Sequence, residues 1–456
     1  MSLIRTVLIS LRSNQVLSLT GNLVVAGLNI ITISLLFRAL PAAEIGSWVF
    51  FITAFGLADA CRAGFLTTGF IRSYAGATFE RAAEVVGSTW AIAIALTAGI
   101  TALSLLAKGV LAFYSVSLGT ALVLNWLGLS LVLTLPTFMA ASVLQGELRF
   151  GAILVLRLLS QGLFVLSIIG LILSKAMSLD HVMNCYLIAA FITGVIVLSM
   201  GWTRIGDLRH RRTECIKQLV HFGKFSIGSF VGASMLRSSD TFIINFMLGP
   251  AALAVYNLAQ RFVELIDLPL RSFLSTAIPS LSAAFNQNDM KEVGRLLRKN
   301  AGLLTWALTP IVLVTMMFAD LPIILIGGNK YVGTPAANLL RIIIFLSLLF
   351  PIDRFTGVTL DVINQPRINL YKVFIMLGVN VLCDITGVLI LKNVYGIALA
   401  NLPTIVVGFA YGYVQLKKFM PVSIKAILAT GLDEIKGVFL TLRNKAPILE
   451  STRQDL

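Results

Sequence analysis

The sequence predicts an all-α membrane protein with about twelve transmembrane helices, arranged as two six-helix bundles around a central cleft. Of its 456 residues, 57% are hydrophobic and only 12% are charged, and the mean hydropathy is +0.90. The apolar residues gather in runs long enough to cross a bilayer, which takes about 20 residues per helix. Lys and Arg fall mainly in alternate gaps between these runs, which is typical of cytoplasmic loops.

The apolar runs form two sets of six. The first set lies near residues 17–37, 45–68, 86–107, 119–144, 150–174 and 182–202, and the second lies near 224–248, 251–276, 301–327, 337–360, 370–391 and 397–416. Twelve such helices leave no room for a soluble catalytic domain. We therefore expect an N-terminal bundle at 1–210, a C-terminal bundle at 211–420, and a cytoplasmic amphipathic tail at 421–456. A helical stretch near Ile424–Leu442 should lie on the inner leaflet.

The positive charges set the predicted orientation. One set of gaps holds only Arg38, Lys108, Lys175, Lys330 and Lys392, whereas most of the 36 Lys and Arg lie in the other gaps and at the ends of the chain. Both termini should therefore be cytoplasmic.

The net charge of +15 could also indicate nucleic-acid binding, with the basic loop 203–223 as the patch. That loop lacks interleaved aromatic residues, and the other cytoplasmic loops are basic too, so we interpret the charge as an orientation signal. The four cysteines show no C-x-x-C spacing and the three histidines are scattered, so no metal site is predicted.

A short internal repeat occurs at the first hairpin of each half. Phe37 stands four residues before Pro41-Ala42-Ala43, and Phe246 stands four residues before Pro250-Ala251-Ala252. In both copies an Arg follows 21 residues after that Pro, at Arg62 and Arg271. Since each half has an even number of spans, the copies insert in the same orientation. Parallel repeats of this kind are typical of transporters whose halves rock about a central site.

Charged side chains inside the spans are the main functional signal. An ionisable group at mid-bilayer costs about 2.5–3.5 kcal/mol, so it normally faces protein or water. Arg341, Asp361 and Arg354 lie near span ends and carry less information, because long side chains reach the interface. The charges could also be ion pairs that join helix to helix. The arginines and acids considered, within or at the ends of the spans, are Arg62, Arg157, Arg237, Arg261, Arg271, Arg341 and Arg354, against Asp59, Asp240, Glu264, Asp267, Asp353, Asp361 and Asp384.

The eighth span carries the longest polar stripe. Spacings of three and four residues place its members on one helix face, which predicts a water-accessible cavity along that face. In the seventh span Arg237 and Asp240 also share a face, and Asp59 and Arg62 repeat the pattern in the second span. The stripe consists of Asn257, Gln260, Arg261, Glu264, Asp267, Arg271 and Ser275.

Several segments resemble a known family. The stretch Phe37-Arg38-Ala39-Leu40-Pro41-Ala42-Ala43-Glu44-Ile45-Gly46 is similar to the R-x-L-x-x-x-E-x-G hairpin of polysaccharide exporters. The segments His221–Lys224, Arg237–Asp240, Leu248–Pro250, Val255-Tyr256, Pro279–Ser282 and Arg149–Arg157 fit as well. Together they resemble the O-antigen (Wzx-type) flippase branch of the multidrug/oligosaccharidyl-lipid/polysaccharide (MOP) exporter superfamily. This resemblance implies a MATE-like fold and a location in the bacterial cytoplasmic (inner) membrane.

The resemblance implies that the protein flips undecaprenyl-diphosphate-linked oligosaccharide for O-antigen, lipopolysaccharide or exopolysaccharide synthesis. Its partners would be the lipid-linked oligosaccharide, membrane lipids, and glycan polymerase and assembly proteins, with no nucleic acid. Guanidinium groups bind phosphate through two parallel hydrogen bonds, so Arg62, Arg237 and Arg271, with Arg261 and Asn257, are substrate-binding candidates. Proton or sodium coupling stays open, and no other cofactor is expected; the candidates for it are Asp59, Asp240, Glu264 and Asp267.

Two other classes stay open. A cation-coupled multidrug antiporter should carry acidic residues free to bind cations in its first half. Only Asp59 lies deep in a span there, and Arg62 shares its face. A glycan polymerase, ligase or glycosyltransferase would need a sizeable external loop or an acidic catalytic pair. The external gaps are short and no D-x-D occurs, so we do not expect an enzyme.

Overall fold

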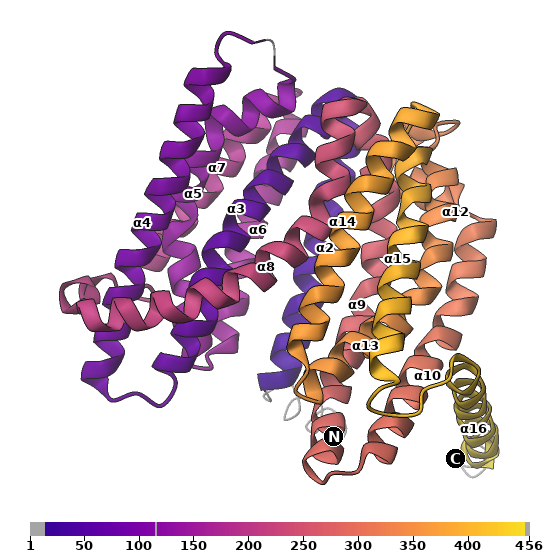
Figure 1. Ribbon diagram of the computed structural model, residues 1–456. Helices are drawn as coiled ribbons and strands as arrows, with labels where there is room; N and C mark the ends of the chain where they lie inside the picture. Colours follow the sequence, from indigo (N-terminus) through magenta and orange to yellow (C-terminus); the bar gives the residue numbers. More distant parts are fainter. Residues whose placement is uncertain (1–13, 115, 452–456) are drawn as a thin grey trace. The chain divides into compact units, whose positions relative to one another are not determined.

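A computed structural model describes residues 14–114 and 116–451, and it is built from α-helices and short 3-10 helices (Figure 1). Parts of the predicted cytoplasmic ends, residues 1–13 and 452–456, lie outside this description. The chain divides into two compact units. Unit 1 comprises Met1–Asn257 and Leu325–Tyr331, and unit 2 comprises Leu258–Ile324 and Val332–Leu456.

Unit 1 holds the first half of the chain. Its helix α3 packs against both α5 and α8, while α2 packs against α6. Side-chain caps fix several helix starts, because the hydroxyls of Thr78, Ser117 and Ser178 each accept a backbone N–H three residues ahead. The elements are α2 (Asn14–Ala39), α3 (Ala42–Tyr74), α4 (Phe79–Leu111), α5 (Leu118–Gly146), α6 (Phe150–Leu173), α7 (Leu179–Ser199), η1 (Ile205–His210), α8 (Thr213–Met247) and the first turns of α9 (Pro250–Asn286).

Unit 2 holds the rest of α9 and the helices that follow it. Helices α14 and α15 lie side by side, and α10 packs against α13 and α16 (Figure 1). Its elements are α10 (Met290–Met317), most of α11 (Asp320–Gly327), α12 (Ala336–Leu346), η3 (Ser347–Leu349), α13 (Phe350–Val362), α14 (Pro366–Leu391), α15 (Tyr395–Leu416) and α16 (Ile424–Ser451).

The end of α11 and the 3-10 helix η2 (Asn329–Tyr331) join unit 1, because polar contacts connect them to the end of α2. Arg38 donates to the Leu325 carbonyl at 2.7 Å, and Lys330 donates to the Leu40 carbonyl. Burial lowers the pKa of Lys330 and raises that of its neighbour Tyr331 to about 12.

The prediction of an all-α polytopic membrane protein is confirmed. Nine helices among the described residues are long and apolar enough to span a bilayer: α3, α4, α5, α6, α7, α10, the α12–α13 segment, α14 and α15. The first, seventh and eighth predicted spans are the helices α2, α8 and α9. Charged residues lower the hydropathy of α8 and α9, whereas the apolar part of α2 with described side chains, Val24–Ala39, is short.

Two predicted spans are interrupted. The run 301–327 is not one helix, because α10 ends at Met317 and the short α11 follows. Phe318, at the end of α10, has φ −112° and ψ 34°, outside the helical region. The run 337–360 is divided by η3, which ends just before Pro351. Proline lacks an N–H, so the hydrogen bond that a continuous helix would make from residue 351 to the carbonyl of Ser347 is missing.

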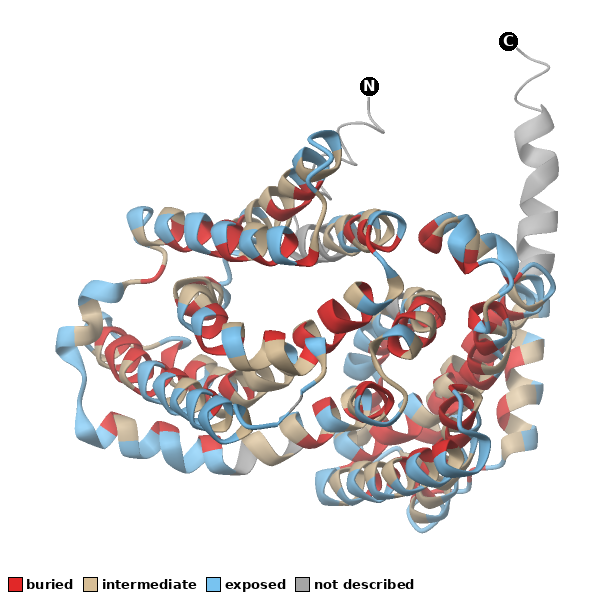
Figure 2. Ribbon diagram, turned by 90° about the horizontal axis from the view of Figure 1, so that it is seen from above, coloured by how far each residue is buried: buried red, intermediate tan, exposed pale blue. Residues whose placement is uncertain are grey.

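Burial along the helices fits a lipid environment. In Figure 2 many helices carry buried residues on one side and exposed residues on the other. On α4 the exposed side includes Leu103, Leu106 and Val110, each about two-thirds exposed. Large apolar side chains in such numbers are unfavourable in water but suit the hydrocarbon region of a bilayer.

The starts of the two repeat copies touch within unit 1. A Cβ placed on Gly46 of α3 would lie 1.6 Å from the carbonyl oxygen of Pro250, the first residue of α9. Next to this contact, Phe50 of α3 packs edge-on against Phe242 and Phe246 of α8. Only glycine allows the two backbones to approach so closely.

We expect Gly46→Ala to destabilise the protein, because the added methyl meets backbone rather than a movable side chain. Overpacking of this kind costs about 1–3 kcal/mol, and the short distance places this site at the upper end. Gly56→Ala in the same helix is the matched control, since nothing lies within 4 Å of its Cβ position. Thermal unfolding of both purified variants in detergent tests this; equal stability of the two would contradict the contact.

The tail is helical as predicted, and the described part of α16 packs on α10. At the crossing a Cβ on Gly302 would lie 2.1 Å from the Ile427 carbonyl oxygen. Trp306 donates its indole N–H to the Leu428 carbonyl at 2.9 Å, and Lys299 pairs with Glu434 at 2.9 Å. The location of α16 on the inner leaflet stays a prediction, as do the predicted domain boundaries at 210 and 420.

Candidate functional site

The polar stripe predicted for the eighth span lies along α9. Asn257 is buried in unit 1, and in unit 2 Asp267 is buried while Glu264, Arg271 and Ser275 are exposed. Arg261 pairs with Glu264 at 2.8 Å. One side of this long helix is therefore lined with alternating charges in the described structure.

Asp267 is the centre of a charged group in unit 2. Its Oδ2 accepts from Arg271 Nε at 2.7 Å and pairs with an Arg271 terminal nitrogen at 2.6 Å. Its Oδ1 lies 3.9 Å from the guanidinium of Arg354 on α13. The carboxylate is 11% exposed, whereas the side chain of Arg271 is 63% exposed. The buried carboxylate of Asp267 therefore positions Arg271, whose side chain remains largely exposed.

A second ion pair joins α13 to α14. Lys372 lies 2.5 Å from Asp353 Oδ1 and also donates to the Asp353 backbone carbonyl at 3.1 Å. The Lys372 side chain is only 4% exposed. With the Asp267 group, this pair gives three cations, Arg271, Arg354 and Lys372, against two carboxylates. The Asp267 group, with two cations against one carboxylate, is therefore net positive, whereas the Lys372–Asp353 pair is neutral.

Sequence reasoning missed two members of this group. Arg354 lies near a span end, where charges carry less information, and Lys372 lies near the start of the span 370–391 and is not among the candidates. The structure places Lys372 in the second turn of α14 and buries it. The signal that could have found the pair is Asp353, an acid within the preceding span that requires a nearby cation.

In unit 1 the Asp59–Arg62 pair of α3 is observed at 2.5 Å. Arg62 also donates to the Leu131 carbonyl of α5 at 3.2 Å, and its guanidinium lies 4.4 Å from the Phe138 ring. The Arg62 side chain is 2% exposed, while that of Asp59 is 37% exposed. In this structure Arg62 joins α3 to α5, and its substrate-binding role stays a prediction.

We expect Arg62→Met to lower the free energy of unfolding by about 3–5 kcal/mol, because it leaves Asp59 and the Leu131 carbonyl without their cation. Arg72→Met, at the exposed end of the same helix, is the control and should cost no more than about 1 kcal/mol, the loss of its contact with the Phe222 ring. Unfolding in detergent micelles measures both. A stable Arg62→Met protein that has lost only transport would instead assign Arg62 to the substrate.

The seventh-span candidates lie on α8. Asp240 is buried, and its Oδ2 accepts a hydrogen bond from the hydroxyl of Tyr256 on α9. Arg237 is exposed and donates to Ser234 at 3.1 Å. Among the described residues no group of three His, Cys, Asp or Glu side chains could hold a metal ion. The predicted residues thus lie in separate groups: around Asp59 and, separately, around Asp240 in unit 1, and at the Arg261–Glu264 pair and around Asp267 in unit 2.

Solved structures with the same architecture define the class of protein. An inward-facing MATE family multidrug resistance transporter of the MOP superfamily matches with a TM-score of 0.71 and 18% identity, over 86% of this chain and 96% of that chain. The lipid II flippase MurJ, in an inward closed conformation, matches with a TM-score of 0.72 and 15% identity, over 94% and 93%. The protein is therefore a polytopic membrane protein with the fold of MOP superfamily transporters.

Within that class, the chain belongs to the polysaccharide biosynthesis protein family, whose sequence profile matches residues 35–335. A curated relative is the probable low-salt glycan biosynthesis flippase Agl15 of Haloferax volcanii, which is 23% identical over 278 residues. The match covers 60% of this chain and 57% of that relative, so the chain spans less than two-thirds of the relative's length. The predicted family is thus confirmed.

Proposed function

We propose that the protein flips an undecaprenyl-diphosphate-linked oligosaccharide from the cytoplasmic to the periplasmic leaflet of the bacterial inner membrane, by alternating access. Membership of the polysaccharide biosynthesis family supports a role in glycan assembly. The relative from Haloferax volcanii bears the name of a probable flippase, and the lipid II flippase MurJ shares the fold. These likenesses favour a lipid-linked cargo over a soluble one.

The observation that carries this proposal is the exposure of Arg271. Its guanidinium pairs with the buried Asp267, and most of its side chain is exposed. Arginine offers a planar fork of donors that fits phosphate oxygens. Arg354 on α13 adds a second exposed cation beside Asp267, which favours a diphosphate. A membrane potential of 100 mV, inside negative, drives negative charge outward. It favours the outward movement of each negative charge by about 2.3 kcal/mol.

Deletion of the gene in its source organism tests the proposal. We expect the lipid-linked repeat unit to accumulate in the cytoplasmic leaflet and surface glycan to be lost, with recovery when the wild-type gene is restored. Accessibility of the repeat unit to a membrane-impermeant lectin, before and after lysis of spheroplasts, reports the leaflet. Normal surface glycan in the deletion strain would contradict the proposal.

A cation-coupled drug antiporter is the second candidate, favoured by the MATE transporter fold. It predicts that the deletion strain becomes more sensitive to cationic drugs while its surface glycan stays intact. Growth of the same strain on a panel of such drugs separates the two functions. Unchanged drug sensitivity would remove the antiporter.

Coupling to a proton or sodium gradient is part of the flippase proposal, with Asp59, Asp240, Glu264 and Asp267 as the candidate residues. Asp59 keeps a partly exposed carboxylate beside Arg62. Flipping in proteoliposomes with an imposed pH or sodium gradient tests the coupling. If the rate of flipping depends on one of these gradients, and the dependence is lost in Asp59→Asn, the coupling ion binds at Asp59 in unit 1. Glycan polymerase and assembly proteins are the proposed partners in the cell.

A further inference from the structure

The face of α9 that carries the predicted stripe continues toward the end of the helix. From Arg271, steps of three or four residues lead to Ser275, Ile278, Ser282 and Asn286, near the end of the helix. Residues at these spacings share one helix face. The face that carries Arg271 therefore reaches the end of α9 that the loop charges predict to be cytoplasmic.

A cavity of about 460 Å³ lies at this end of the face, between α9 and the end of α13. Ser282, Phe285 and Asn286 contribute from α9, and Asp361 and Asn364 contribute from the other side. Its volume lies within the usual range of small-molecule sites, about 300–1,000 Å³. All of these residues belong to unit 2, as do Arg271 and Arg354.

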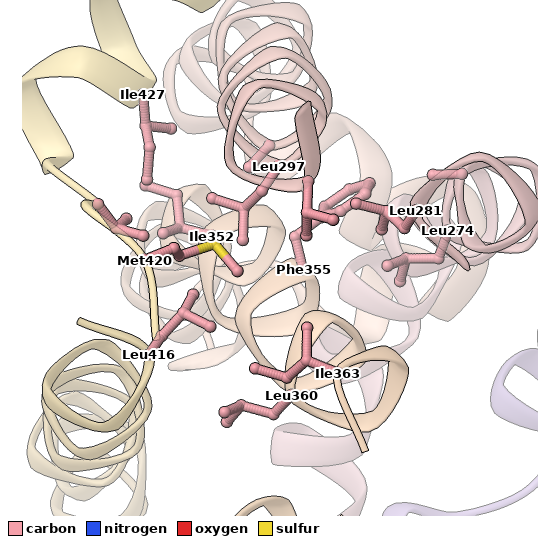
Figure 3. Close-up of a cluster of buried hydrophobic side chains, with 14 of the residues drawn as sticks. Leu274, Leu281, Leu297, Ile352, Phe355, Leu360, Ile363, Leu416, Met420 and Ile427 are labelled. Atoms are coloured by element: carbon pink, nitrogen blue, oxygen red, sulfur yellow. The ribbon is translucent and has the colours of Figure 1, made fainter. Parts of the chain in front are cut away.

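The walls of the cavity are held by the core of unit 2. Leu274 and Leu281 of α9, together with Leu360 and Ile363 of the α13 segment, belong to one buried cluster (Figure 3). These residues alternate with the lining residues along the same two segments. Because close-packed side chains resist displacement, the two walls keep a fixed spacing.

The polar groups of the cavity are also positioned. Asn369 donates to Asp361 Oδ2 at 2.9 Å. The backbone N–H of Asn364 bonds to the Asp361 carbonyl at 3.2 Å. Asn364 has a φ of 59°, a left-handed conformation that asparagine tolerates better than most residues. This turn brings the Asn364 and Asp361 side chains to the same rim.

The lining suits a neutral, hydroxyl-rich molecule. A carboxylate, a hydroxyl and two amides supply acceptors and donors for hydroxyl groups. Phe285, with Ile278, Val358 and Val362, supplies apolar surface against which the faces of sugar rings can pack. Among the described residues that line the cavity, only Asp361 carries a charge. Its carboxylate is negative and therefore disfavours the binding of phosphate. Ile278 and Ser282 lie seven and eleven residues from Arg271, or about 10–16 Å along the helix.

We infer that this cavity binds a neutral saccharide unit of the glycan cargo, a few linked sugars away from a diphosphate held at Arg271. The inference rests on the proposed flippase function. It adds a binding site that recognises the sugars of the cargo. A cargo whose glycan reaches the cavity gains contacts that a monosaccharide cargo lacks. The protein therefore prefers longer glycans, and the residues of this cavity set that preference.

Saturation-transfer NMR on the full-length protein in micelles tests the binding, with the neutral disaccharides maltose and chitobiose as probes. We expect transfer to at least one of them. Asn286→Ala and the isosteric Asp361→Asn should each weaken the signal about fivefold to tenfold, the effect of losing one or two hydrogen bonds. Gln287→Ala, at the exposed neighbouring position outside the cavity, is the matched control. Absence of transfer to both sugars, or transfer unchanged in both cavity variants, would overturn the inference.

Flipping assays with two synthetic cargoes separate this inference from the proposed function. Polyprenyl-diphosphate carrying a tetrasaccharide and one carrying a monosaccharide are compared in proteoliposomes. We expect the wild-type ratio of rates to exceed one and to fall toward one in Asn286→Ala and Asp361→Asn. An unchanged ratio with active flipping would overturn the saccharide site alone. Failure to flip either cargo, with disaccharide transfer retained, would overturn the flippase function and leave the saccharide site standing.

Discussion

Arg271→Ala is expected to slow translocation of a diphosphate-linked cargo by about tenfold to a hundredfold. The loss corresponds to one charge-assisted hydrogen bond, which contributes about 1.5–3 kcal/mol. Arg271→Lys should fall between wild type and alanine, because lysine keeps the charge but loses the planar fork. The rate is measured in proteoliposomes with a polyprenyl-diphosphate oligosaccharide.

Arg341→Ala is the matched control for Arg271. Arg341 is also an arginine of unit 2 in a single ion pair, with Asp320 at 3.0 Å, but it lies on α12 away from the Asp267 group. We expect this variant to retain the wild-type rate. If Arg271→Ala translocates as fast as Arg341→Ala, the guanidinium at Asp267 does not bind the cargo.

Lys372→Met is expected to reduce the free energy of unfolding by about 3–5 kcal/mol, the usual cost of leaving one partner of a buried ion pair alone. Asp353→Leu should have a similar effect. The double variant should recover much of this loss, because apolar side chains often replace a buried pair at little cost. Denaturant unfolding in micelles gives the coupling energy between the two residues.

Lys418→Met provides the reference for Lys372. Lys418 is exposed just beyond α15, so its loss should change stability by no more than about 0.5 kcal/mol. Additive effects of Lys372→Met and Asp353→Leu in the double variant would mean that the two side chains do not interact in the folded protein. Recovery in the double variant would show that they do.

Much of the fold could be predicted because membrane helices obey strong local rules. Each of the predicted runs corresponds to helical structure, since backbone polar groups in lipid must bond within their own segment. The breaks between Met317 and Asp320 and at η3 were missed, because hydropathy averages over such short irregularities. The stripe on α9 was visible from spacing alone, and its exposed members Glu264, Arg271 and Ser275 lie where that spacing places them.

The sequence by itself determined the positions and order of the apolar runs and their polar faces, because these depend on residues close together in the chain. Only the tertiary structure decided which charged side chains remain exposed. Arg62 and Arg271 occupy the same position in the two repeat copies, yet Arg62 is buried against Leu131 and Phe138 while Arg271 is open beside Asp267 and Arg354. Their surroundings come from other helices, so no local pattern could distinguish them.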